Sequence, residues 1–231
     1  VRHGQSIWNL EKRFTGWVDV DLTEKGKLEA EKAGLLIKSK NINIDFYYSS
    51  LQSRANNTIK IIQKVLNDEK FFTRAWQLNE RHYGALTGLS KIEMSKKIGE
   101  DKVYELRRSW DIKPEALNKE SPYHPINIEI YKKTPREVIP DTESLKDTYE
   151  RVTKYFKLEI EKKLIIKNIL ISAHGNSIRA LCKYFFKLDN NQISRLEIPT
   201  GNPLVIEFNK EFKLINSEYL DKERAKDLLI F

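Results

Sequence analysis

Residues 168–180 read Asn-Ile-Leu-Ile-Ser-Ala-His-Gly-Asn-Ser-Ile-Arg-Ala, a short apolar run followed by a His-Gly step and the start of a helical pattern. The run over 168–173 predicts a buried strand, and apolar residues recur at helical spacing over 177–187. A strand that leads directly into a helix is the repeating unit of parallel α/β sheets. This stretch therefore places His174 at the carboxyl end of a strand, the edge where such sheets bind ligands.

Short apolar runs and helical patterns alternate along most of the chain. Further strands are predicted over 44–49, 71–78, 203–208 and 212–219, and further helices over 24–40, 54–67, 90–98, 101–110 and 143–164. Thr23 is expected to cap the first of these helices. We therefore expect an α/β fold with a mostly parallel central sheet flanked by helices on both faces, formed as a single domain by residues 1–231.

Two regions depart from this pattern. Residues 111–141 are rich in proline and show no sustained periodicity, which is typical of a lid or a binding insertion in a compact domain. We expect this irregular insertion to cover the site. The chain opens directly on Arg2-His3-Gly4, and we expect Val1 to be the last residue of a strand whose earlier part lies upstream.

Composition narrows the class of partner. The 231 residues are 40% hydrophobic and carry a formal net charge of +8, which would suit nucleic acid, an anionic membrane or a small anionic substrate. Lysines alternate with acidic residues along the predicted helices, which is typical of a helix face exposed to water. The sequence contains no nucleic-acid-binding module, no spacing typical of zinc ligands and no apolar run of the ~20 residues that span a membrane. The single cysteine, Cys182, fits a reducing compartment. We expect a cytoplasmic protein that binds no nucleic acid, no membrane and no metal.

Two His-Gly steps, at His3 and at His174, each follow the end of a predicted strand and should face one pocket. Glycine at the next position, as in Gly175, lets the backbone turn sharply and lets an anion approach closely. Asn9 follows the first step and Asn176 the second, where an amide and the N–H groups of a helix start suit a phosphate. A lone His-Gly is more often a turn or core histidine, but two at matched positions among four histidines favour a site.

Arginines and a carboxylate add to this edge. Arg2 adjoins one histidine and Arg54 begins a helix just after a predicted strand; guanidinium groups bind phosphate bidentately. The turn at 78–84 contains a carboxylate, a cation, an imidazole and a phenol, and Glu80 is its natural acid–base candidate. Arg107-Arg108 could be surface charge at a helix end or a clamp for a carboxylate or second phosphate.

Seven blocks of sequence together resemble the cofactor-dependent phosphoglycerate mutases of the histidine phosphatase superfamily: 2–9, 13–17, 22–26, 78–84, 107–108, 173–180 and 198–205. The likeness is collinear over nearly the whole chain and is weakest in 111–141 and after 219. The Arg-His-Gly step marks only the superfamily. The block 79–84, together with the Arg107-Arg108 pair and Pro199-Thr200-Gly201, is much more specific to the mutase branch than that step is.

This resemblance implies a phosphoglycerate mutase-like fold and an isomerase of glycolysis and gluconeogenesis. Such an enzyme interconverts 2-phosphoglycerate and 3-phosphoglycerate, is primed by 2,3-bisphosphoglycerate, needs no metal and is a homodimer or homotetramer. It implies that His3 becomes phosphorylated, that Arg2, Arg54 and His174 surround the transferring phosphoryl group, and that Glu80 moves the proton. The further substrate contacts implied are Asn9, Thr15, Gly16, Tyr83, Lys91, Arg107, Arg108, Gly175 and Asn176.

The chain departs from the family pattern at several positions. Gln5 stands where the family usually has Glu, and Gln52-Ser53 replace an apolar and a basic residue. The tail after Tyr219 is short and divergent, although in the family the tail helps to close the site. Two alternatives are a phosphatase or bisphosphatase of the same superfamily and a non-enzymatic phosphometabolite-binding protein. The arginine pair 107–108 favours a mutase over the first alternative, and the nucleophile and acid–base candidates argue against the second.

Overall fold

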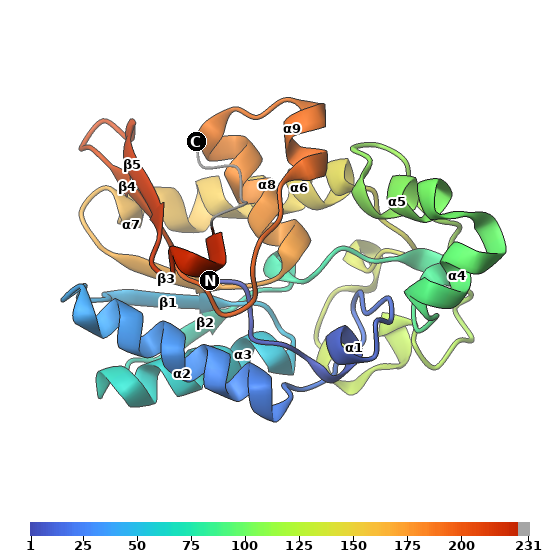
Figure 1. Cartoon of the computed structure of the whole chain (residues 1–231), viewed down its shortest axis with the longest axis horizontal. Helices are drawn as coiled ribbons and strands as arrows, with labels where there is room; N and C mark the ends of the chain where they lie inside the picture. The colour runs from blue at the N-terminus through green and yellow to red at the C-terminus, as the bar shows by residue number, and fades with distance from the viewer. Residues whose placement is uncertain (226–231) are drawn as a thin grey trace.

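A parallel three-stranded sheet lies at the centre of the chain, in the order β2–β1–β3 (Figure 1). The computed structural model describes residues 1–225, so the end of the divergent tail, 226–231, lies outside it. The strands are β1 (Phe46–Ser49), β2 (Phe72–Arg74) and β3 (Ile169–Ser172). β1 pairs in register with both neighbours, as in the pair of Tyr48 with Ile171.

Helices cover both faces of this sheet (Figure 1): α2 (Glu24–Ser39) and α3 (Ser53–Leu66) lie on one side, α6 (Leu145–Tyr155) and α8 (Gly175–Phe186) on the other. Successive side chains of a strand point to opposite faces of the sheet, so one strand can contribute to both helical layers. Tyr47 packs with Ile59 and Ile62 on one face, whereas Tyr48 packs with Phe156 and Leu181 on the other. The predicted α/β class, with a parallel sheet between two helical layers, is confirmed.

The backbone of Arg2 continues the sheet beyond β3. It bridges in parallel to Ala173 on one side and to Thr200 on the other, and the amide of His3 donates to the carbonyl of Ala173 at 3.0 Å. His3 therefore lies next to the carboxyl end of β3, where His174 follows. The expected strand upstream of Val1 and the organisation as one domain stay predictions.

The remaining elements surround this core. They are α1 (Ile7–Leu10), α4 (Lys91–Ile98), α5 (Glu100–Arg108), a π-helical turn (Phe156–Ile160), α7 (Glu161–Leu164), α9 (Asn190–Arg195) and the antiparallel hairpin of β4 (Leu204–Phe208) and β5 (Leu214–Tyr219). Short 3₁₀ turns occur at Trp76–Leu78, Gly84–Leu86, Pro125–Asn127, Glu129–Tyr131, Arg136–Val138 and Glu223–Ala225. No helix within residues 1–225 is long and apolar enough to cross a membrane.

Most predicted boundaries hold to within a few residues. Thr23 caps α2 by accepting the amide of Gly26 at 3.0 Å, as predicted. The helix predicted over 143–164 forms as α6, the π-helical turn and α7. α8 begins two residues earlier than predicted, at Gly175, and the short helices α1 and α9 were not predicted because each has too few residues to show a periodicity.

The strand predicted over 71–78 is wrong in its second half. Its last sheet hydrogen bond runs from the Ala75 amide to the carbonyl of Ser49, which is the end of β1. Beyond that point β1 offers no partner, and the chain turns into the 3₁₀ turn Trp76–Leu78. The guanidinium of Arg151 donates hydrogen bonds to the carbonyls of Gln77 and Asn79 instead.

Two glycines let the loop after His3 lie directly against α2. A Cβ on Gly4 would come within 2.0 Å of the carbonyl oxygen of Gly26, and one on Gly26 within 2.1 Å of that of Gln5. Both obstacles are backbone atoms, which cannot rotate away. The position of the His3 loop therefore depends on the absence of side chains at this contact.

We expect Gly26→Ala to lower the free energy of unfolding by about 2 kcal/mol, because the added methyl forces backbone to move. Without the clash, alanine in a helix would raise stability by about 0.5–1 kcal/mol. Urea denaturation measures the difference. Gly175→Ala is the matched control, since its added Cβ meets nothing closer than 3.8 Å. Equal stability of Gly26→Ala and the wild type would contradict the steric argument.

Candidate active site

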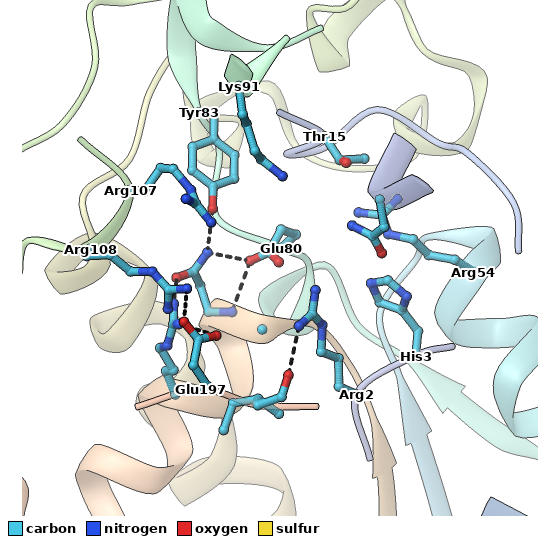
Figure 2. Close-up of a pocket in the computed structure, with 15 residues that line it drawn as sticks. Arg2, His3, Thr15, Arg54, Glu80, Tyr83, Lys91, Arg107, Arg108 and Glu197 are labelled. Carbon is cyan, nitrogen blue, oxygen red and sulfur yellow. Dashed lines mark hydrogen bonds and ion pairs between the residues drawn. The ribbon is translucent and has the colours of Figure 1, made fainter. Parts of the chain in front are cut away.

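A small pocket of about 130 Å³ opens at the carboxyl edge of the sheet (Figure 2). It is lined by Arg2, His3, Asn9, Thr15, Arg54, Glu80, Tyr83, Lys91, Arg107, Arg108, Gly175, Asn176, Arg179, Glu197 and Ile198. Figure 2 shows two poles: His3 and Arg54 lie at one end, and Arg107 and Arg108 at the other. A pocket of this size is below the roughly 300 Å³ of sites for drug-sized ligands, so it suits a small anion.

His3 is held in one tautomer. Its Nδ1 lies 2.6 Å from the carbonyl oxygen of Gly4, and a carbonyl can only accept, so Nδ1 carries the proton. The other ring nitrogen, Nε2, then has a free lone pair. Burial, with the charges of Arg54 and Arg2, holds the pKa of His3 well below its ordinary value. At neutral pH this histidine is therefore an uncharged imidazole with a nucleophilic nitrogen.

His174 lies beside His3 with its ring centroid 4.9 Å away. Its Nε2 is 2.8 Å from the hydroxyl of Ser50, and its backbone amide donates to the hydroxyl of Ser177 at 3.0 Å. Burial and Arg54 also hold the pKa of His174 well below its ordinary value. His174 is fully buried and lies behind the pocket surface rather than lining it.

Arg54 is a buried cation that is held by backbone carbonyls. It is 1% exposed, and its guanidinium donates to the carbonyls of Val18 at 2.9 Å and Gly16 at 3.0 Å. Among residues 1–225 no carboxylate forms an ion pair with it within 4.0 Å. Arg2 similarly donates to the carbonyl of Ile198 at 2.7 Å. Because a buried charge is costly unless an opposite charge compensates it, this end of the pocket favours an anionic ligand.

Glu80 is held by one oxygen. Its Oε1 accepts from the amide of Arg81 at 2.8 Å, and from the backbone and side-chain nitrogens of Asn176 at 3.2 and 2.9 Å. The side-chain nitrogen of Asn176 also lies 3.0 Å from the hydroxyl of Tyr83. Oε2 has none of these partners, so it remains able to give or accept a proton within the pocket.

The far pole contains Lys91 from α4 and Arg107 and Arg108 from α5. Burial, followed by the charge of Arg107, lowers the pKa of Lys91 to about 8. Arg108 forms an ion pair with Glu197, and Arg179 lies 3.6 Å from the same carboxylate. This pole has the charge and geometry to bind a second anionic group.

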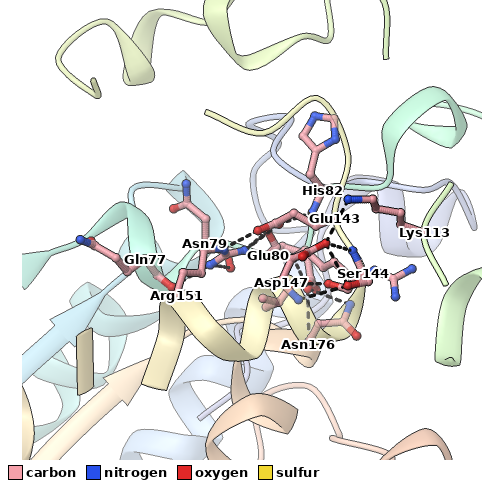
Figure 3. Close-up of polar contacts among 12 residues, drawn as sticks. Gln77, Asn79, Glu80, His82, Lys113, Glu143, Ser144, Asp147, Arg151 and Asn176 are labelled. Carbon is pink, nitrogen blue, oxygen red and sulfur yellow. Dashed lines mark hydrogen bonds and ion pairs between the residues drawn. The ribbon is translucent and has the colours of Figure 1, made fainter. Parts of the chain in front are cut away.

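A buried ion pair supports the turn that carries Glu80 (Figure 3). Arg151 donates to both oxygens of Glu143, at 2.6 and 2.9 Å, and to the carbonyl of Glu80 at 2.9 Å. Glu143 in turn accepts the amide of His82 at 2.8 Å. The pair therefore fixes the backbone on both sides of Glu80 from the face opposite the pocket.

Gln52 links the two loops that meet behind His3. Its side chain is fully buried; it donates to the carbonyl of Gly16 at 2.8 Å and accepts the amide of Glu80 at 3.0 Å. An apolar side chain here, as expected from the family pattern, could form neither bond. These two hydrogen bonds explain why the chain has glutamine rather than an apolar residue at position 52.

The structure brings the predicted site residues together, except that Gly16, like His174, lies behind the pocket surface. Sequence reasoning missed Arg179, Glu197 and Ile198 in the lining, and Gln52, Glu143 and Arg151 in the support. Of these, Arg179 and Ile198 lie within blocks of the family resemblance, which was the available signal. No group of three His, Cys, Asp or Glu side chains within residues 1–225 is placed to hold a metal ion.

The prediction that 111–141 covers the site stays a prediction. Within the part of the chain that the structure describes, no residue of this segment lines the pocket. The segment packs against the loops that carry site residues: the hydroxyl of Tyr131 donates to the carbonyl of Trp17 at 2.6 Å, and the amide of Ala85 donates to that of Glu115 at 2.8 Å. Proline content predicted irregular backbone, but it carried no information about which loops that backbone contacts.

Comparison with known proteins gives close sequence relatives. The family model of the histidine phosphatase superfamily (branch 1) matches residues 1–126 and 119–218. A 2,3-bisphosphoglycerate-dependent phosphoglycerate mutase of Pelagibacter ubique (strain HTCC1062) is 66% identical over 232 residues, covering 100% of this chain and 98% of that protein. A protein of the same name from Borreliella burgdorferi (strain ZS7) is 48% identical, covering 96% of this chain and 91% of that protein.

Solved structures share the fold at low identity. YhfR of Bacillus stearothermophilus matches with a TM-score of 0.68 and 20% identity, covering 93% of this chain and 91% of that one. A mycobacterial glucosyl-3-phosphoglycerate phosphatase matches with a TM-score of 0.67 and 19% identity, covering 94% of each chain. At such identity these likenesses support the architecture alone.

We expect the affinity for a phosphate ester that also carries a carboxylate to fall as the pH rises through about 8. The pKa of Lys91 in the free protein is lowered to about 8, so this cation is lost above that pH, whereas an anionic group bound beside it favours the charged amine. The fall should approach about tenfold per pH unit above pH 8. Titration with 3-phosphoglycerate from pH 7 to 9.5 measures it. Lys91→Met should bind more weakly with a nearly flat profile; an equally steep fall in that variant would refute the assignment.

Proposed function

This chain belongs to the histidine phosphatase superfamily and, within it, to the 2,3-bisphosphoglycerate-dependent phosphoglycerate mutases, and we propose from that membership that it interconverts 2-phosphoglycerate and 3-phosphoglycerate. The family evidence is an identity of 66% that extends over the whole chain. The observation on the site that best supports the proposal is its two poles. A neutral imidazole lies among arginines at one end, and an independent pair of arginines lies at the other.

His3 is proposed as the group that is phosphorylated. 2,3-Bisphosphoglycerate supplies the phosphoryl group that primes it. The fixed tautomer supports attack from Nε2, because Nδ1 is occupied by the carbonyl of Gly4. Arg2 and Arg54 would bind the equatorial oxygens of the transferring group, where charge develops in the transition state. The lack of a carboxylate partner for Arg54 among the described residues supports this role.

Glu80 is proposed to move the proton in both halves of the reaction. When the free hydroxyl of phosphoglycerate attacks the phosphorus on His3, Glu80 takes the hydroxyl proton and the P–N bond breaks, returning its electron pair to Nε2. When Nε2 then attacks the other phosphoryl group, the P–O bond breaks and Glu80 returns the proton to the leaving oxygen. The net result moves one phosphoryl group between two oxygens of glycerate and leaves His3 phosphorylated.

The far pole is proposed to hold the carboxylate of the substrate through Arg107 and Arg108, with Tyr83 and Lys91 beside it. Asn9, Thr15, Gly16, Gly175 and Asn176 are proposed as further contacts around the phosphoryl group. A mutase needs this second pole because the bisphosphate must reverse between two transfers without leaving. The alternative, a phosphatase in which water accepts the phosphoryl group, has no need of it, and the structural likeness to phosphatases supports only the fold.

We also propose that the protein is cytoplasmic and forms a homodimer or homotetramer. β2 pairs with β1 alone in the described sheet, so its other side is an edge. Phe71, directly before that edge strand, is 86% exposed and stacks on Phe72. An exposed aromatic side chain beside an open strand edge is typical of a surface that a second copy covers.

The deciding experiment is a coupled assay of 3-phosphoglycerate conversion on the full-length protein. Turnover should depend on trace 2,3-bisphosphoglycerate, since only a phosphorylated His3 can begin the cycle. Label from labelled bisphosphoglycerate should appear on the wild type as an acid-labile adduct and be absent from His3→Ala. Activity without the primer, or inorganic phosphate as the main product, would exclude the mutase.

Glu80→Gln separates proton transfer from phosphorylation of the protein. The amide keeps an oxygen for the contacts with Asn176 and the Arg81 amide but cannot exchange a proton. We expect turnover to fall by about 10²–10⁴-fold. Labelling of His3 by bisphosphoglycerate should persist, although more slowly. Turnover at the wild-type rate would show that another group carries the proton.

A further inference from the structure

The pocket holds one carboxylate to which the proposed reaction assigns no role. Its lining carries six cationic side chains, Arg2, Arg54, Lys91, Arg107, Arg108 and Arg179, against two carboxylates. Glu80 is one, and it is held by its contacts with Arg81 and Asn176. The other is Glu197, in the segment between α9 and β4. In a pocket suited to anions, a carboxylate on the wall competes with the ligand.

Glu197 is held only by guanidinium groups among the described residues. One oxygen accepts from Arg108, and the other lies 3.6 Å from Arg179. The two arginine side chains are 10% and 6% exposed, whereas that of Glu197 is 55% exposed. Figure 2 shows it against Arg108, at the end of the pocket away from His3. A carboxylate so open to water can leave its partners with little desolvation penalty.

The two arginines depend on Glu197 to different degrees. Arg179 also donates to the carbonyl of Leu196 at 2.6 Å and to Asn176 at 3.0 Å, so it keeps two partners when Glu197 leaves. Glu197 is the one hydrogen-bond partner that Arg108 has within the described chain, and Nη1 of this arginine is buried without any. Loss of Glu197 without replacement would leave Arg108 buried and uncompensated, so exchange for a ligand anion is favoured at Arg108.

We propose that Glu197 occupies, in the free protein, the position on Arg108 that the carboxylate of the substrate takes, and that it sets the selectivity of this pole by competing with it. The inference rests on the proposed function, since it takes the ligand to be a phosphoglycerate. Exchange of one carboxylate for another leaves the charge around Arg108 constant. A ligand without a carboxylate cannot make this exchange and gains nothing from displacing Glu197.

The test compares Glu197→Gln with the wild type for two ligands that share a phosphate ester. Calorimetry on protein freed of 2,3-bisphosphoglycerate prevents turnover during the titration. We expect the variant to bind 3-phosphoglycerate about three- to tenfold more tightly, because the competing charge is gone. Binding of glycerol 3-phosphate, which lacks the carboxylate, should change by less than about twofold, because only the screened field of a half-exposed charge is altered.

Two further variants make the result specific. Arg108→Ala should bind 3-phosphoglycerate weakly, and adding Glu197→Gln to it should give no gain, because the exchanged position no longer exists. Glu218→Gln is the matched control: this carboxylate also pairs with two cations, Lys40 at 2.7 Å and Lys222 at 3.4 Å, but on the β4–β5 hairpin outside the pocket. It should bind both ligands as the wild type does.

Each other outcome overturns the inference. Weaker binding of 3-phosphoglycerate by Glu197→Gln would mean that Glu197 merely holds Arg108 in place. If Glu197→Gln bound both ligands more tightly by the same factor, the cause would be the loss of a negative charge near the pocket in general. It would not be the removal of a carboxylate that competes for Arg108. Failure of the proposed function looks different, because the wild type itself would then show no preference for 3-phosphoglycerate over glycerol 3-phosphate.

Discussion

The positive charge of Arg54 and Arg2 is the constraint around which this site is built. Arg54 is fully buried and Arg2 is partly buried, and the charge of each adds to burial in lowering the pKa of His3 and of His174. Backbone carbonyls rather than carboxylates hold both guanidinium groups. Carbonyl dipoles orient the cations without neutralising them, so the positive potential remains available to an anion. Burial, together with this potential, keeps His3 and His174 neutral, and a nucleophilic imidazole must be neutral.

The other polar contacts around the site are of two kinds. An ion pair fixes the backbone, and contacts within the pocket leave one oxygen of Glu80 available. On the side away from the pocket, Arg151 and Glu143 neutralise each other and immobilise the turn that bears Glu80. Within the pocket, Asn176 holds one oxygen of Glu80 and leaves the other. A buried pair of this kind adds little net stability, because desolvation offsets most of its attraction. Its contribution is to geometry.

The sequence predicts local features well and contacts between distant residues poorly. Strand and helix periodicity locate β1, β3, α3 and α8, and the end of β3 places the His174-Gly175 step at the edge of the sheet. Glu197 pairs with a residue 89 positions away, and Arg151 reaches a carbonyl 71 positions away. No periodic pattern in the sequence identifies such partners. A carboxylate or arginine that forms a long-range ion pair has the same kind of neighbours in sequence as one that does not. The position of 111–141 could not be predicted for a related reason: its packing is set by Tyr131 and Glu115 meeting loops elsewhere in the chain.

The carbonyl oxygen of Gly16 helps to connect several parts of the pocket wall. One oxygen accepts both the guanidinium of Arg54 and the amide of Gln52, and Gln52 also holds the amide of Glu80. The loop of Gly16, the start of α3 and the turn of Glu80 are thus fastened together through the Gly16 carbonyl and the Gln52 side chain, and we expect them to behave as one stiff wall. The α4 side of the pocket differs, since the residues of this helix are only partly buried or exposed. Stiffness is therefore distributed unevenly around the pocket, and we expect the α4 side to yield more readily than the wall around Gly16.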